Sequence, residues 1–592
     1  MRTRSSGKLE GPGSLILPQR TTRRKRRESL SSRKTPINGV PPEILAYILK
    51  AILEDVVGHL GFPGRGLDGV PQWWSSRRWA QLAEVCRYWR ATFLSDPSLW
   101  STIIIDKSTR YRGKRHQNNV VQTYLANSGE LPLRVYAYNP FSLAPVAQHC
   151  GRLLDLRVQF TQPEVESVMS VFTSPAPVLE TLEVRYHDAK VGSGEGPSHY
   201  APVHLPRLFR NQTPSLRRLS LQRTFSSDVN LFTDLTHVVI RGRGDGVSFS
   251  KRDMLLILSL LKRSPHLQEM NIVSPKWIPN DVSVNIATNE LERLSLPALQ
   301  RLSLKRFPFS ESAYFLDRVE IPVGCDLAIS EVAGTYSGLF DALPQNTLRI
   351  GTVQNFTSLA LLQKDWSFAW VVAIGPSGSL RISLSDLYWQ MKPHEEDMKH
   401  TPFYWIQPLF HRQCFDGWNF PLIHLKELYI TGPTSLPRTN AQVWASILRP
   451  LSSLELLVVR CRDSNEVFSA LGSQDTTMTA SPVICPNLKL LHICDPRAPI
   501  AWTVALTCLN FRKAQGYQLR IKLWHISSEG YSITGSKPAH PDLEELNGCS
   551  CPEILIPDEA RLDRHQYWDE WPPFEPELDD EDLEGEDEGF DD

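Results

Sequence analysis

The sequence predicts an α/β protein built as an elongated array of strand–helix repeats, preceded by a short helical domain. Three observations predict it. A six-residue apolar pattern returns along most of the chain, helix-like segments separate its copies, and an apolar helical segment precedes the first copy. The chain has 592 residues, of which 41% are hydrophobic and 22% charged, so we expect most of it to fold as a globular body.

The recurring pattern is L-x-x-L-x-[LIVM]. Its last three alternating positions suit one face of a short strand, and its first leucine enters the core from the preceding turn. In five copies a proline lies two residues before the first leucine, where it ends one element before the next strand begins. The copies begin at Leu153, Leu179, Leu216, Leu235, Leu267, Leu299, Leu425, Leu454 and Leu488.

Helix-like segments such as 253–264 and 441–451 lie between the predicted strands, and most copies start 19 to 37 residues apart. A strand followed by a helix at this period is typical of a leucine-rich repeat solenoid, in which stacking buries the apolar face of each unit. An ordinary α/β fold is the alternative. The pattern decays between about 305 and 420, where only the segment from Leu380 resembles it, so we expect weaker units, insertions or a break in curvature there.

Residues 37–100 predict two helices and a closing turn. The first helix begins at Pro41–Pro42 and is expected to stop at Gly58. Its apolar positions are Ile44, Leu45, Ile48, Leu49, Ile52 and Val56. The second helix lies within 73–94, with apolar positions Trp79, Leu82, Ala83, Cys86, Trp89 and Phe93. An Asp-Pro turn then leads to Leu99 and Trp100.

These residues resemble an F-box, by a Pro-Pro-Glu-Ile-Leu opening, a Val-Cys-Arg-x-Trp-Arg helix and a Pro-x-Leu-Trp ending. With the segments 101–106 and 123–138, they are similar to the F-box proteins abundant in mushroom-forming fungi. A longer insert between the helices, carrying Trp73 and Trp74, departs from the pattern. The resemblance implies a three-helix unit that docks on a Skp-type adaptor, and through it on a cullin–RING ubiquitin ligase.

The candidate adaptor-binding residues are Pro41, Pro42, Glu43, Ile44, Leu45, Ile48, Leu49, Val85, Cys86, Trp89, Leu99 and Trp100. Leu99 and Trp100 are also expected to anchor the helical unit to the first strand of the body. The alternative is that residues 37–100 act only as a helical cap on the first repeat.

The two ends carry opposite charge. Residues 1–35 have eleven Lys or Arg and two Glu, whereas residues 569–592 have fourteen Asp or Glu and no Lys or Arg. We expect a disordered basic tail (1–36), the F-box-like domain (37–100), the solenoid (101–555) and a disordered acidic tail (556–592). No signal peptide or membrane span is evident, and the ten cysteines are irregularly spaced, which favours a cytoplasmic or nuclear protein.

The sequence shows no phosphate-binding loop, zinc-protease helix or nucleophile elbow, so we expect no catalytic, cofactor-binding or metal-ligating residues. The run at 23–27 is basic but lacks the aromatic residues that stack on bases, so we do not expect nucleic acid as a partner. The expected function is substrate recognition in an SCF-type ubiquitin ligase. The alternative is an F-box protein, or a capped repeat scaffold, that mediates protein–protein interaction outside a ligase; an enzyme is a third class.

Overall fold

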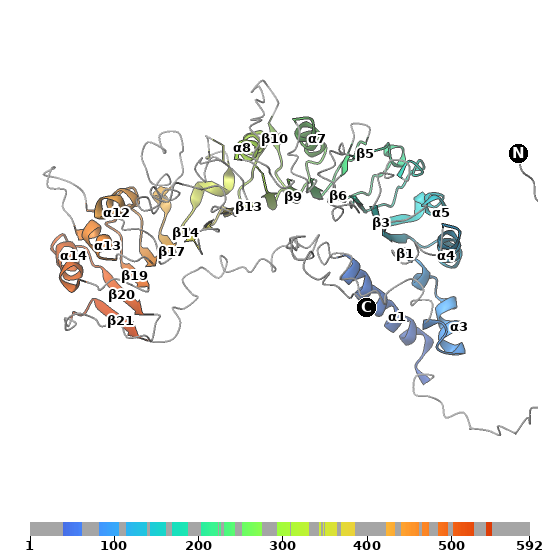
Figure 1. Cartoon of the computed structure of the whole chain (residues 1–592), viewed down its shortest axis with the longest axis horizontal. Helices are drawn as coiled ribbons and strands as arrows, with labels where there is room; N and C mark the ends of the chain where they lie inside the picture. Colours follow the sequence, from blue (N-terminus) through green and yellow to red (C-terminus); the bar gives the residue numbers. More distant parts are fainter. Residues whose placement is uncertain are drawn as a thin grey trace, which may run out of the picture.

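The recurring leucines form the buried spine of a long curved sheet in the computed structural model of the chain (Figure 1). All nine leucines that open the pattern are buried, as predicted. The structure describes residues 39–61, 82–105, 114–138, 143–160, 169–186, 203–222, 224–226, 230–242, 251–274, 293–307, 309–330, 343–344, 347, 350–363, 369–384, 422–431, 440–460, 464–472, 483–494, 501–525 and 540–547.

Seventeen strands of the described residues form one sheet, which alternates with helices. Its strands are β1 (Thr102–Ile105), β2 (Leu133–Tyr138), β3 (Leu153–Phe160), β4 (Thr181–Tyr186), β6 (Arg218–Gln222), β8 (His237–Arg241), β9 (Glu269–Val273), β11 (Arg301–Lys305), β13 (Asp326–Ser330), β14 (Ser358–Gln363), β15 (Ala369–Gly375), β16 (Gly378–Leu384), β17 (Glu427–Thr431), β18 (Leu456–Arg460), β19 (Leu490–Cys494), β20 (Arg520–His525) and β21 (Leu543–Asn547). Two short parallel pairs lie apart from it: β5 (Val203–Leu205) with β7 (Thr224–Ser226), and β10 (Leu294–Ser295) with β12 (Val319–Glu320).

In the main sheet, equivalent positions of the leucine pattern lie directly beside each other on neighbouring strands. Because side chains alternate between the two faces of a strand, this register sends one apolar column into the core across the whole sheet. The column that holds the second leucine of the pattern is buried on every strand. It runs through Ile103, Val135, Leu156, Leu182, Leu219, Val238, Met270, Leu302, Leu327, Leu380, Ala373, Leu359, Leu428, Leu457, Leu491, Ile521 and Leu543.

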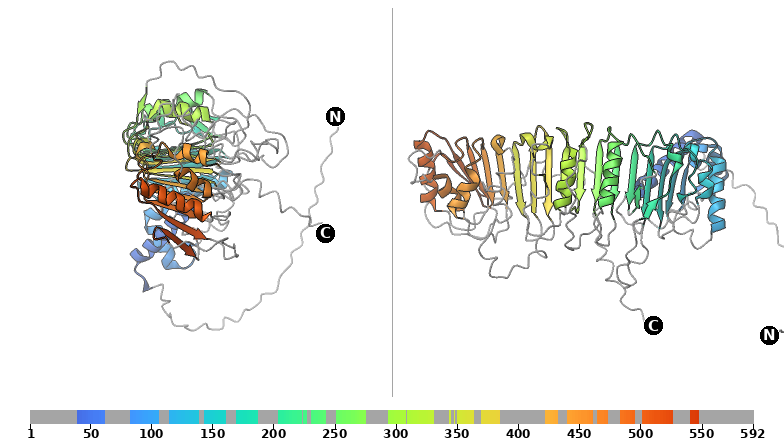
Figure 2. Two further views of the ribbon diagram at one scale, coloured as in Figure 1. Left: turned by 90° about the vertical axis from the view of Figure 1, so that its left-hand side faces the viewer. Right: turned by 90° about the horizontal axis from the view of Figure 1, so that it is seen from above.

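The helices that connect the strands lie on the outer side of the arc and the strands line its inner side (Figure 1), with the strands side by side in one row (Figure 2). The predicted helices of the repeats are confirmed as α7 (Lys251–Lys262) and α12 (Ala441–Leu448). The others on this side are α4 (Lys114–Asn127), α5 (Ala144–Ala147), α8 (Phe309–Arg318), α13 (Ser464–Gly472) and α14 (Trp502–Ala514). The start of α13 caps both of its neighbours: Glu466 Oε2 accepts from Ala441 N at 2.8 Å and Asn465 Oδ1 from Ala501 N at 2.9 Å.

The sheet changes its topology between β13 and β17, inside the region where the sequence pattern decays. There β14, β15 and β16 form an antiparallel meander, whereas the other neighbouring strands of the sheet are parallel. The spatial order of the strands is β13–β16–β15–β14–β17. The three strands of the meander therefore lie between two parallel halves of the sheet, in the reverse of their order along the chain. The sequence predicted weaker units, insertions or a break in curvature here; the structure has an antiparallel meander, and its strand β16 contains the segment from Leu380 that resembles the pattern.

The N-terminal helical segment differs in detail from the prediction. Helix α1 (Pro42–Gly61) continues three residues past Gly58. The predicted second helix is broken, because α3 (Arg87–Ser95) starts only after a turn, with Cys86 in extended conformation as its N-cap. The Cys86 sulfur accepts from Trp89 N at 3.4 Å, an interaction that a continuous helix would not allow. A short 3₁₀ helix, η3 (Pro97–Trp100), follows, and the Asp96 carboxylate caps it.

Both charged tails, together with Trp73, Trp74 and Trp79, lie outside the described residues. None of the helices that the structure describes is long and apolar enough to cross a bilayer.

Candidate interaction surfaces

Helix α1 has two apolar faces. Leu45, Leu49 and Leu53 are buried in the core of the chain. On a neighbouring side of the helix, Ile44, Tyr47 and Ile48 are 51%, 71% and 43% exposed. Since residues at i, i+3 and i+4 share one side of a helix, these three side chains form an exposed stripe, which we call the outer face of α1.

The candidate adaptor-binding residues divide between these two environments. Exposed to solvent are Pro41, Pro42, Glu43, Ile44, Ile48 and Val85, and half-buried are Cys86 and Trp89. Buried within the chain's own core are Leu45, Leu49, Leu99 and Trp100. Of the eleven large apolar side chains that are exposed among the described residues, five belong to the segment 44–94; besides the outer face of α1 these are Val85 and Leu94.

Leu99 and Trp100 join the helical segment to the first repeat. The Trp100 indole N–H donates to the Phe93 carbonyl oxygen at 2.7 Å, and its ring packs edge-on against Phe93 and Tyr124 at 4.9 and 5.1 Å between centroids. Tyr124 lies on α4, beyond strand β1. The Tyr88 hydroxyl donates to the Val40 carbonyl oxygen and so ties α3 to the residues before α1. The expected anchoring of Leu99 and Trp100 is therefore present.

The inner face of the sheet is charged over its first half. From β2 to β6 a network runs across the strands. The Tyr136 hydroxyl donates to Asp155 Oδ2 at 3.1 Å, and Arg157 donates to both oxygens of Asp155 at 3.1 Å while stacking over the Tyr136 ring at 5.3 Å. Arg185 pairs with Glu183 on β4. Asp155, Arg157 and Glu183 occupy positions that the leucine pattern leaves unspecified, so the sequence indicated only that they lie on predicted strands.

The second half of the inner face carries an apolar cluster beside charged positions such as Arg381 and the Lys522–Glu544 pair. A separate cluster, on the opposite side of the sheet from the main core, joins β14, β15, β17, β18 and β19. Its buried members are Ala360, Leu362, Val372, Tyr429, Val458 and Cys494. This apolar cluster begins in the antiparallel meander and is confined to β14–β19 of the described strands.

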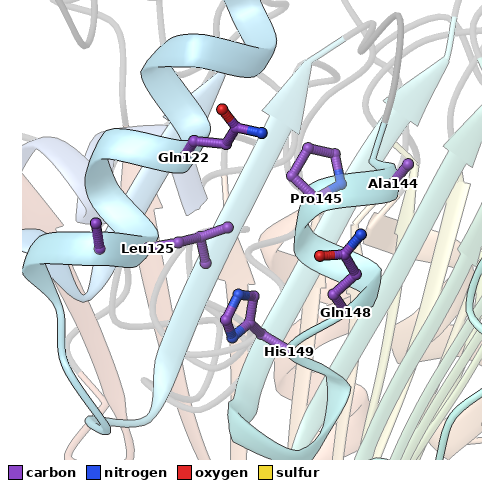
Figure 3. Close-up of a pocket in the computed structure, with 7 residues that line it drawn as sticks. Gln122, Leu125, Ala144, Pro145, Gln148 and His149 are labelled. Atoms are coloured by element: carbon purple, nitrogen blue, oxygen red, sulfur yellow. The ribbon is translucent and has the colours of Figure 1, made fainter.

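Figure 3 shows a shallow cavity of about 360 Å³ between α4 and α5, on the outer side of the arc. Gln122 and Leu125 of α4 face Pro145, Gln148 and His149 across it. Its lining holds one imidazole and no carboxylate or thiol, so it lacks the paired groups that acid–base or metal chemistry needs.

Several free cysteine thiols are buried in the described part of the chain. Burial raises the pKa of Cys508 to about 11 and the pKa of Cys485 to about 12, so both remain protonated at neutral pH. No group of three or more His, Cys, Asp or Glu side chains with metal-binding geometry occurs in the described residues. Cys549 and Cys551 lie outside them.

Comparison of the chain with models of known protein families, and with curated proteins, gave no match.

Proposed function

We propose that the protein is a substrate-recognition subunit of an SCF-type ubiquitin ligase. Its N-terminal helical segment, which resembles an F-box, docks on a Skp-type adaptor, and its leucine-rich-repeat-like array binds the protein to be modified. The observation that carries the proposal is the outer face of α1, where Ile44, Tyr47 and Ile48 are exposed beside a fully formed inner face.

A purely structural cap would not require this outer face. Capping the first repeat uses side chains that point into the chain, and Leu45, Leu49 and Trp100 already do so. Apolar side chains gathered outside a closed core mark a surface that a partner covers. A scaffold that uses the same segment outside a ligase remains the second candidate, because it would need the same docking surface.

The test separates the two faces of α1. The double variant Ile44→Ala/Ile48→Ala removes exposed side chains, so we expect loss of the co-purifying Skp-type adaptor and cullin with little change in melting temperature. Apolar anchors at the centre of an interface typically cost about 2 kcal/mol or more each, roughly thirtyfold in affinity.

The matched control is Leu45→Ala/Leu49→Ala, the same chemical change on the inner face. We expect each truncation to cost about 2–5 kcal/mol of stability, because it leaves a cavity in the core. Wild-type protein that captures no adaptor would refute the ligase proposal. Adaptor without cullin would favour the scaffold, and adaptor retained by Ile44→Ala/Ile48→Ala would show that the outer face is not the docking surface.

A further inference from the structure

The cavity between α4 and α5 combines an apolar floor with uncharged polar walls (Figure 3). Each wall adds one carboxamide, Gln122 from α4 and Gln148 from the end of α5. The imidazole of His149 lies at one end. The apolar surface comes from Leu125, Ala126, Ala144 and Pro145. We call this site the α4–α5 pocket.

Side-chain hydrogen bonds tie the two walls of the pocket to each other. The hydroxyl of Ser128, which directly follows α4, donates to the Leu125 carbonyl oxygen at 3.0 Å. Arg152, shortly after α5, donates from Nη2 to the Ser128 hydroxyl oxygen at 2.8 Å and to the Leu131 carbonyl oxygen at 2.8 Å. The pocket is therefore formed in the free protein, and a ligand can enter it with little rearrangement of the chain.

The polar side chains of the pocket are available to a ligand. Within the described part of the chain, the side chains of Gln122, Gln148 and His149 make no hydrogen bond or ion pair. Both glutamines are exposed. A carboxamide carries an acceptor oxygen and N–H donors on one small group. Two carboxamides on opposite walls therefore suit a ligand with two groups that each donate and accept.

The charge of the lining limits which ligands fit. No Lys, Arg, Asp or Glu side chain lines the pocket. A carboxylate, phosphate or ammonium group bound there would lose water without gaining an ion pair. The apolar floor favours a hydrocarbon group, and a volume of about 360 Å³ is near the lower end of the range for ligand sites. The pocket therefore suits one large apolar side chain.

A polypeptide in extended conformation has this combination of groups. Each peptide group carries one N–H donor and one carbonyl acceptor, and an apolar residue has such a group on either side. In a helix these groups are already paired within the helix, so an extended segment is needed.

We propose that the α4–α5 pocket binds a short extended segment of a partner protein. One apolar side chain of the segment lies on the floor, and its two flanking peptide groups bond to Gln122 and Gln148. The inference is independent of the adaptor, because neither α1 nor α3 lines the pocket.

The experiment uses blocked amino acids, the smallest probes with this chemistry. Saturation-transfer NMR on the full-length chain gives the Kd of N-acetyl-leucine N-methylamide, which has an apolar side chain and both flanking peptide groups. We expect a Kd in the low millimolar range, as is usual for so small a ligand. N-acetyl-glycine N-methylamide lacks the side chain and should bind at least about tenfold more weakly. Free leucine, whose ends are charged, should do the same.

Three variants locate the site. Gln122→Ala/Gln148→Ala should weaken binding of the leucine probe at least about fivefold, because both carboxamides are lost. The control Gln515→Ala/Gln518→Ala makes the same change at exposed glutamines at the end of α14 and should leave binding unchanged. Ala126→Trp fills the pocket from an exposed position of α4, so it should abolish binding with little change in melting temperature.

The opposite results would overturn the proposal. If the glycine probe or free leucine binds as tightly as the leucine probe, the pocket does not select an apolar side chain between peptide groups. If Gln122→Ala/Gln148→Ala or Ala126→Trp retains wild-type affinity, the probe binds elsewhere on the chain. Equal weakening by the two glutamine double variants would also contradict this site.

Discussion

At the scale of single residues, the buried carboxyl group of Glu311 gives the fold a pH dependence. It lies in the first turn of α8, and its Oε2 is buried without a hydrogen-bond partner. Burial raises its pKa from 4.5 to about 7. Between these values the unfolded chain releases the proton while the native chain keeps it, so ionisation favours unfolding as pH rises and the full penalty is present above pH 7.

We therefore expect Glu311→Gln to stabilise the protein at pH 8, on the order of 3 kcal/mol, and to have little effect near pH 4.5. The measurement is the difference in unfolding free energy between the two proteins across this range. His237 and His492, whose pKa values burial lowers to about 4, act in the opposite sense but equally in both proteins, so they cancel. A difference that does not grow with pH would show that Glu311 is ionised in the native state.

At the scale of elements, the turn between β15 and β16 holds the meander against the parallel half before it. Gly324 N donates to the Ser377 carbonyl oxygen at 2.7 Å. Gly378 has φ +113°, and a Cβ there would lie 2.5 Å from the Cys325 carbonyl oxygen. Both the backbone conformation and the close approach of β13 therefore require glycine at this position.

We expect Gly378→Ala to lower the unfolding free energy by about 2 kcal/mol or more, because it adds both backbone strain and a steric clash. Gly151→Ala is the control: a Cβ there meets nothing within 4 Å, and the change should stay within about 0.5 kcal/mol. Denaturant titration of both variants checks this, and similar midpoints for the two would contradict it.

The sequence predicted those features that depend on neighbouring residues in the chain, and it missed those that depend on contacts between distant segments or on backbone conformation. Leu302 and its counterparts on the other strands were placed correctly because a strand's buried positions follow from alternation alone. The break before α3 was missed because Cys86 fits the helical stripe, whereas its extended backbone and the contact of its sulfur with Trp89 N show that the helix starts there. The sequence of α1 likewise did not show that Leu45 is buried and Ile44 exposed, because both are apolar and adjacent in the chain. Their burial depends on which side of the helix packs against the rest of the protein.

At the scale of the whole molecule, the inner face was beyond prediction. Arg157 and Asp155 are two residues apart in one strand, but the Glu183 that continues their network comes from the next repeat, and the register decides which charges meet. The stacked core, by contrast, followed from the repeat itself.

That core makes the array sensitive to a single buried charge. Leu302 is fully buried between Met270 and Leu327 in the neighbouring strands, so Leu302→Asp would bury an unpaired carboxylate. We expect loss of solubility, or a large fall in melting temperature with proteolysis around residue 302, because adjacent repeats stabilise one another. Leu255→Asp, on the exposed side of α7, should be tolerated. Wild-type melting of Leu302→Asp would contradict the register.

The antiparallel meander has a consequence for the order in which the molecule assembles. Parallel neighbours in this sheet pair only after 14 to 63 residues of intervening chain have closed, whereas β15 and β16 pair across the two-residue turn Pro376–Ser377. Hairpins form in about 1–10 μs, and pairing over short sequence separation loses the least chain entropy. The middle of the array is thus the fastest place to start, and β13 and β17 can add to its two edges independently. Growth outward in both directions would leave the helical segment and β21 as the last parts to settle.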